Sequence, residues 1–264
     1  MSADRDALLA EVASAYEGLE DPAAFPDADA LERYRAGLLE RTAEQADFIA
    51  GRLERPAHVV EAACGNGRLL IELARRGVIG QGVGFDIARS RIAFARRWAS
   101  DLGLGAIAFS DEDVLRVELA PGHFGAAICI TGSLAYFEPA QPGLARAVLE
   151  RLSSALAPGG LLVLELYPHP RERALLEAAG GEARLWRELP DDDPWRFYLS
   201  DFALDPETEV LTHAKTFVHR TTGEVDEGRR ERILLYTEQS IAQALAAAVV
   251  VAVFTWRLTR FTYD

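Results

Sequence analysis

The chain has 264 residues, of which 49% are hydrophobic and 26% charged, and its formal net charge is -13. This length and composition fit one large globular domain, or a domain with a lid, and exclude a disordered chain. Because a strongly acidic protein repels a phosphate backbone, we expect no nucleic-acid partner. The acidity itself has two interpretations: it keeps the protein soluble, or it favours a cationic substrate.

The cysteine content and the terminal segments predict where the protein works. Cys64 and Cys129 lie in or beside apolar runs without a nearby histidine cluster, which indicates neither a disulfide framework nor a metal site. Residues 1–22 lack the apolar core of a signal peptide, and the longest apolar stretch, 244–256, is too short to span a bilayer. We therefore expect a cytoplasmic protein with no membrane partner. Its oligomeric state stays open, with a homodimer as one alternative.

The first fifty residues have a helical pattern. Apolar side chains recur at helical spacing between residues 27 and 53, and Asp27 or Asp29 is placed to serve as the N-cap. We expect residues 1–54 to form a helical cap.

From residue 58 onward, short apolar runs alternate with longer amphipathic segments. Such alternation predicts a doubly wound, mostly parallel sheet with helices on both faces, a Rossmann-like α/β fold. The predicted strands are 58–63, 82–86, 106–110, 125–131 and 161–167, and the predicted helices are 66–77, 88–103 and 143–156, the last one stopped by the turn "APGG".

The pattern changes after residue 167. Three longer segments, 195–205, 209–223 and 224–236, alternate polar and apolar residues without intervening helices, which predicts antiparallel strands. A helix capped by Thr237 and a final strand over 249–256 follow. The expected divisions are therefore the cap 1–54, an α/β core 55–184, an antiparallel lid 185–236 and a return to the core 237–264.

The stretch "VVEAACGNGRLLIELARRG", residues 59–77, places an acid and two glycines between a buried strand and a helix. Glycines at such a turn let a ligand approach the backbone closely, although the turn could also support only itself. The dinucleotide fingerprint needs a third glycine, and Leu70 stands in its place. A nicotinamide cofactor is thereby disfavoured.

Two further acids follow the next two predicted strands. Asp86 ends "GVGFD", where a carboxylate can accept hydrogen bonds from both hydroxyls of a ribose. Asp113 lies after the third strand, where it could accept from the amine of adenine, or could equally be a helix cap or a loop acid.

These segments, in order and at the usual spacing over residues 58–167, resemble class I S-adenosylmethionine-dependent methyltransferases. The motifs that match are "VVEAACGNGR", "GVGFD", "DEDVLRVEL", "FGAAICITGSLAYF" and "LAPGGLLVLELY". The N-terminal helices and the antiparallel insertion after the fifth strand resemble the small-molecule branch of that family. The resemblance implies a seven-stranded sheet, S-adenosyl-L-methionine as the cofactor, a small-molecule methyl acceptor and no metal.

The resemblance also implies roles for individual residues. Glu61 would order the turn near the methionine amine, Asp86 would hold the ribose, and Asp113 would take the adenine amine. The other cofactor-binding residues that it implies are Ala63, Gly65, Asn66, Gly67, Ile87, Val114, Ile130, Thr131 and Tyr16, the last folding over the cofactor from the N-terminal segment.

Two departures from the family pattern stand out. Ala63 replaces a more usual glycine, a change that is common at this position. The Gly-Phe pair that usually precedes the sixth strand is missing from 246–264, so the last strand of the sheet could be short, shifted or absent.

Methyl transfer from a sulfonium is an in-line displacement that needs alignment and exclusion of water rather than a protein nucleophile. A general base helps only for some acceptors. The candidates at the strand ends are Tyr136, Tyr167 and His169; the inserted segment adds Trp186, Trp195, Tyr198 and His213, each of which could instead be a core or turn residue.

Three functions remain open from the sequence. The first is methyl transfer to a small molecule, with a slight preference for an amine because of the acidity, and with O- or C-methylation as alternatives. The second is a regulator or subunit that binds S-adenosylmethionine without catalysis. The third, disfavoured by Leu70, is a nicotinamide oxidoreductase.

Overall fold

The computed structural model describes residues 20–21, 25–54, 56–166, 169–191, 193–248 and 253–256. The chain divides into two compact units. The first comprises Met1–Ser133, Arg146–Glu165 and Leu245–Trp256, and the second comprises Leu134–Ala145, Leu166–Ala244 and Arg257–Asp264.

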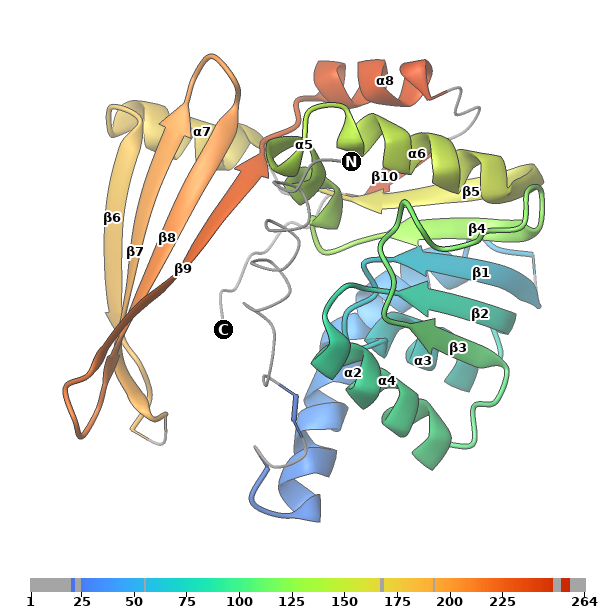
Figure 1. The fold of residues 1–264 in the computed structure, drawn as a ribbon, viewed down its shortest axis with the longest axis horizontal. Helices are drawn as coiled ribbons and strands as arrows, with labels where there is room; N and C mark the ends of the chain where they lie inside the picture. Colours follow the sequence, from blue (N-terminus) through green and yellow to red (C-terminus); the bar gives the residue numbers. More distant parts are fainter. Residues whose placement is uncertain are drawn as a thin grey trace. The chain divides into compact units, whose positions relative to one another are not determined.

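The first unit is built on a six-stranded sheet in the order β10-β5-β4-β1-β2-β3, in which every neighbouring pair is parallel (Figure 1). From β1 the chain first adds β2 and β3 on one side and then β4, β5 and β10 on the other. This reversal of strand order beside β1 is the arrangement of a doubly wound fold. The strands are β1 (Ala57–Ala62), β2 (Ile79–Phe85), β3 (Ile107–Ser110), β4 (Phe124–Cys129), β5 (Leu156–Glu165) and β10 (Val253–Trp256).

Two of the helices begin at residues that the sequence marks as caps. The carboxylate of Asp27 accepts a hydrogen bond of 2.7 Å from Ala30 N, which confirms the predicted cap of α2 (Ala28–Ala50). Thr237 and Ser240 exchange two 2.9 Å hydrogen bonds at the start of α8 (Glu238–Ala247), as expected for a cap. The remaining helices are α3 (Arg68–Arg75), α4 (Arg89–Asp101) and α6 (Leu144–Ala155).

The second unit contains a four-stranded antiparallel sheet in the order β6-β7-β8-β9 (Figure 1). A small core of its own, with Leu176, Leu204, Leu211 and Ile233, lies under this sheet. The elements of the unit are the 3-10 turn η2 (Ser133–Tyr136), α5 (Phe137–Ala140), α7 (His169–Ala178), β6 (Glu182–Glu188), β7 (Trp195–Asp205), β8 (Val210–His219) and β9 (Val225–Leu234).

The structure differs from the sequence-based expectations in three elements. The segment "APGG" lies inside β5 instead of in a turn, because a register shift between Phe124 and Ala126 of β4 accommodates the extra residues. A helix, α7, occupies the segment after the predicted fifth strand. Among the described residues the parallel sheet has six strands instead of seven, and the segments 249–252 and 257–264 lie outside them.

The divisions 1–54, 55–184, 185–236 and 237–264 stay a prediction. In the parts of the chain that the structure describes, no helix is both long enough and apolar enough to cross a membrane.

Candidate functional site

The turn between β1 and α3 holds an unusual run of backbone conformations. Ala63, Gly65 and Gly67 all have positive φ, at 53°, 54° and 73°. For an alanine this left-handed conformation costs about 1–2 kcal/mol, so the turn is held by its surroundings. Cys64 N donates to Phe85 O of β2 at 3.1 Å, and Gly67 N donates back to Cys64 O at 3.0 Å.

The two glycines of this turn differ in the space around them. A Cβ at Gly67 would lie 2.6 Å from the ring of Phe109, whereas one at Gly65 would meet only the movable guanidinium end of Arg91, at 2.8 Å. Gly65 is therefore needed for its φ, and Gly67 both for its φ and for close packing.

Asp86 connects the end of β2 to the glycine turn. Its carboxylate accepts from Gly65 N at 2.8 Å with Oδ2, and from Ala88 N at 2.9 Å with Oδ1. The side chain is only half-buried. Since a carboxylate can accept about four hydrogen bonds, each oxygen keeps a lone pair for a ligand at the carboxyl edge of the sheet.

Glu61, near the end of β1, is a buried carboxylate with incomplete hydrogen bonding. It is 2% exposed, and Oε2 has no partner among the described residues. Burial raises the pKa of this carboxyl to about 8, and the nearby Arg68 opposes that rise. A buried unpaired carboxylate oxygen is costly unless water or a ligand completes it.

Arg68, the first residue of α3, links the turn to its neighbours. Its guanidinium donates to Thr42 Oγ1 at 2.5 Å and to Gln45 Oε1 at 2.7 Å, both in α2. It also donates to Thr131 Oγ1, beyond β4, at 3.1 Å. Helix α2 is thereby fastened to the carboxyl edge of the sheet.

Glu165 is a third carboxylate at this edge and was not predicted as a site residue. Its Oε2 accepts from Gln45 Nε2 and from Thr131 N, both at 2.7 Å, while Oε1 has no partner in the described part of the chain. Burial raises the pKa of this carboxyl. It holds Thr131, whose φ of 59° is rare for a β-branched residue, and the following Gly132 at 69°.

Comparison with known proteins agrees with this geometry. Residues 59–160 match the family model of a methyltransferase domain. The chain is 34% identical over 119 residues to a demethylmenaquinone methyltransferase of Thermus thermophilus, covering 44% of this chain and 50% of that protein. The chain thus spans about half the length of this curated relative.

Solved structures show the same fold. The CcbJ methyltransferase from Streptomyces caelestis aligns with a TM-score of 0.65 at 18% identity, covering 90% of this chain and 84% of that one. CalS10, an amino pentose methyltransferase from Micromonospora echinaspora solved with bound S-adenosylmethionine, aligns with a TM-score of 0.62 at 19% identity, covering 85% and 89%. Residues 59–160 therefore match a methyltransferase domain, and the chain has the fold of S-adenosylmethionine-dependent methyltransferases.

Within the methyltransferase domain, the side of the turn formed by Asn66 contains a contact that the sequence did not suggest. Asn66 is buried and donates to Glu20 Oε1 at 2.6 Å. Glu20 also accepts from Tyr34 at 3.0 Å and from Arg91 Nε at 3.0 Å. No local pattern marks Glu20, because its partners lie 14, 46 and 71 residues away.

The adenine-side predictions lie on neighbouring loops of the methyltransferase domain. Asp113 Oδ1 accepts a hydrogen bond from Leu115 N at 2.9 Å. Such a local bond is what we expect if Asp113 is a cap or loop acid, the alternative to a role in binding adenine. Val114 and Ile130 are buried and Ile87 is half-buried. Their roles toward a cofactor remain predictions.

Of the predicted catalytic residues, the structure describes the side chain of Tyr136 alone, so their roles stay predictions. Tyr16 and Tyr167 lie outside the described residues, and of His169 only the backbone, at the start of α7, is described. Tyr136 lies in the second unit, where its hydroxyl donates to Glu231 Oε2 at 3.5 Å.

Proposed function

We propose that this chain binds S-adenosylmethionine at the glycine turn and transfers its methyl group to a small-molecule acceptor. One observation supports this most: the carboxylate of Asp86 accepts a hydrogen bond from Gly65 N, so that an acid and the glycine turn meet at the carboxyl edge of the parallel sheet. Ligands of doubly wound folds bind at this edge, beside the strand where the order reverses.

The residues present fit the cofactor. Asp86 keeps lone pairs that suit the two ribose hydroxyls. Glu61 offers a buried, unpaired oxygen that suits the ammonium of the methionine part. Gly65 and Gly67 let the turn adopt its left-handed conformations beside Asp86. Asp113 remains the candidate for the adenine amine, with Ile87 and Val114 beside the ring.

When bound, S-adenosylmethionine supplies a methyl group activated on a sulfonium. The chain itself then has to hold, orient and shield the reactants, which are the main contributions a protein makes to such a displacement. The fixed turn, with Asp86 and Glu165 bonded to backbone N–H groups, provides a rigid site of this kind. Tyr136, Tyr167 and His169 stay the candidates for a general base that removes a proton from the methyl acceptor.

The observations that bear on the chemical class of the methyl acceptor do not all favour the same class. The net charge of -13 favours an amine. The curated relative is named for demethylmenaquinone, and CalS10 for an amino pentose. All of these are small molecules, and we keep N-methylation as the first alternative beside O- and C-methylation.

A second function, binding of S-adenosylmethionine without methyl transfer, leaves the same site intact. Only a measurement of methyl transfer distinguishes this binding function from the enzyme. We therefore propose to incubate the full chain with S-adenosylmethionine labelled in its methyl group and a small-molecule extract of the host. We expect label to appear in a metabolite in proportion to time and protein.

The matched control is the Asp86→Ala variant at the same concentration, which should transfer far less label. If Asp86→Ala transfers as much label as the wild-type chain, Asp86 takes no part in the reaction and the proposed site is wrong. Absence of transfer despite saturable cofactor binding would favour the regulator.

A further inference from the structure

Gly65, in the middle of the glycine turn, is buried beneath a side chain of helix α4. The position that a Cβ of Gly65 would take lies 2.8 Å from the guanidinium carbon of Arg91 and 2.9 Å from each of its two terminal nitrogens. Because these three distances are nearly equal, the flat face of the guanidinium, and not its edge, lies over the glycine. A ligand that contacts Gly65 on this face therefore needs the space that Arg91 takes.

The carboxylate of Glu20, in the segment before helix α2, holds Arg91 in this place. Arg91 Nε donates to Glu20 Oε2 at 3.0 Å, and the two side chains are 25% and 3% exposed. Arg91 stands in the first turn of α4, where the helix dipole opposes a cation instead of attracting it. The attraction that keeps the guanidinium over Gly65 therefore comes from Glu20 and not from the helix.

The other oxygen of the Glu20 carboxylate binds two neutral donors. Oε1 accepts from Asn66 Nδ2 at 2.6 Å and from the Tyr34 hydroxyl at 3.0 Å. Burial and, next, the charge of Glu20 raise the pKa of Tyr34 to about 12, so the phenol keeps its proton and donates it at pH 7. Since Asn66 belongs to the glycine turn and Tyr34 to α2, one carboxylate connects the turn, helix α2 and Arg91.

We propose that Arg91 is a movable cover of the cofactor site and that Glu20 is the latch that keeps this cover over Gly65. The inference rests on the proposed function, because it takes the glycine turn to bind S-adenosylmethionine. Binding requires the guanidinium to leave Gly65 and its ion pair with Glu20. The apparent affinity is then the intrinsic affinity multiplied by the fraction of molecules in which Gly65 is uncovered.

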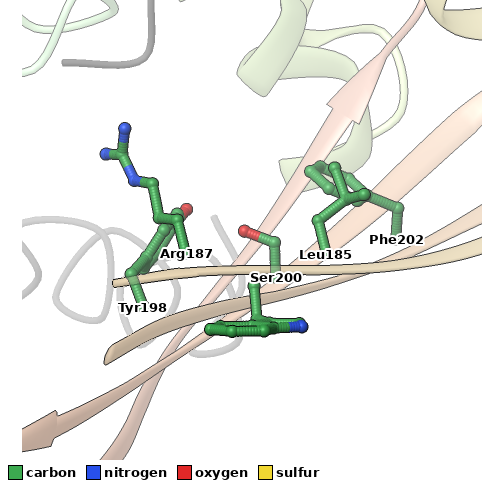
Figure 2. A pocket seen from close by; sticks show the side chains of 6 residues that line it. Leu185, Arg187, Tyr198, Ser200 and Phe202 are labelled. Carbon is green, nitrogen blue, oxygen red and sulfur yellow. The ribbon is translucent and has the colours of Figure 1, made fainter. Parts of the chain in front are cut away.

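The contacts of the cover and the latch all lie within the first unit. None of them depends on the second unit or on its pocket between side chains of β6 and β7 (Figure 2). Titrations of the full chain with a cofactor-like ligand therefore test the latch directly.

The change Glu20→Gln separates the latch from the rest of the cluster. A glutamine oxygen can keep the hydrogen bonds from Asn66 and Tyr34, whereas its amide nitrogen cannot accept from Arg91. We expect this variant to bind the demethylated product of S-adenosylmethionine about three- to tenfold more tightly than the wild-type chain, since one charge-assisted contact of a partly exposed cation is lost. Calorimetric titration measures the change. The demethylated product is the probe because it carries no net charge at pH 7, so that deleting an acid does not by itself weaken its attraction to the protein.

Two further variants complete the test. The matched control is Glu32→Gln, which removes an exposed acid of α2 that pairs with Arg35 at 2.7 Å, and its affinity should equal that of the wild type. Arg91→Ala removes the cover itself and should tighten binding by a similar factor to Glu20→Gln. Adding Glu20→Gln to Arg91→Ala should then change nothing, because the latch has no cover left to hold. Circular dichroism checks that each variant is folded, and either single variant alone decides the question.

The gain in affinity is what distinguishes a latch from a structural role, because loss of a merely structural contact leaves binding unchanged or weakens it. A folded Glu20→Gln or Arg91→Ala variant that binds the product no more tightly than the wild type would therefore overturn the latch. So would an equal gain from Glu20→Gln with and without Arg91. Product binding by the wild type without a gain in the variants refutes the latch alone, whereas absence of binding in every chain refutes the proposed function and the latch with it.

Discussion

Asp86→Ala is expected to weaken the binding of S-adenosylmethionine about 10- to 150-fold. The loss corresponds to about 1.5–3 kcal/mol, the usual cost of removing charge-assisted hydrogen bonds to two hydroxyls. The structure adds a second reason: the carboxylate also accepts from Gly65 N and Ala88 N, so the variant loosens the turn itself. Calorimetric titration of the purified variant measures the change.

The control for this prediction removes the same charge elsewhere in the first unit. Asp47→Ala deletes an exposed acid that pairs only at the surface, with Arg76 at 2.5 Å. We expect its affinity for the cofactor to equal that of the wild type. Unchanged affinity in Asp86→Ala would remove Asp86 from the site.

Gly67→Ala is expected to lower the free energy of unfolding by about 2–5 kcal/mol. A left-handed φ costs an alanine about 1–2 kcal/mol, and overpacking a tight site costs about 1–3 kcal/mol. Both apply here, because φ is 73° and the new Cβ would lie 2.6 Å from the Phe109 ring and 2.9 Å from Ala95 Cβ. Urea denaturation followed by circular dichroism measures the loss.

Gly77→Ala separates the two causes. Gly77 has a similar φ of 65°, yet a Cβ there meets nothing within 4 Å. This control should lose only the backbone contribution, about 1–2 kcal/mol. If both variants lose the same free energy, the crowding around Gly67 is not what the structure describes.

The central part of the site could be predicted because its signals are local. Glu61 and Asp86 each follow an apolar run, and the two glycines stand directly before a helix. Parallel strands bring such ends to one edge of the sheet, so their meeting follows from the fold class alone. The hydrogen bond from Gly65 N to Asp86 agrees with this reasoning.

Glu165 was missed because the predicted strand extended past it to residue 167. We assigned functional roles to residues at strand ends and not to residues inside strands. The observed strand ends at Glu165, which places its carboxylate at the edge of the sheet. The same rule that selected Asp86 would have selected it with the correct boundary.

Other contacts could not be predicted because their partners are far apart in sequence. Glu20 lies 71 residues from Arg91, and Gln45 lies 120 residues from Glu165. Helical periodicity shows which face of a helix is apolar, but not which polar side chain reaches a distant loop.

The measurement that tests the account most directly is a calorimetric titration of the wild-type chain with S-adenosylmethionine, with its demethylated product and with NADH. The account predicts one-to-one micromolar binding of the first two at comparable strength, and no saturable binding of NADH, because Leu70 replaces the third glycine of the dinucleotide fingerprint. Saturable binding of NADH without binding of S-adenosylmethionine would contradict it.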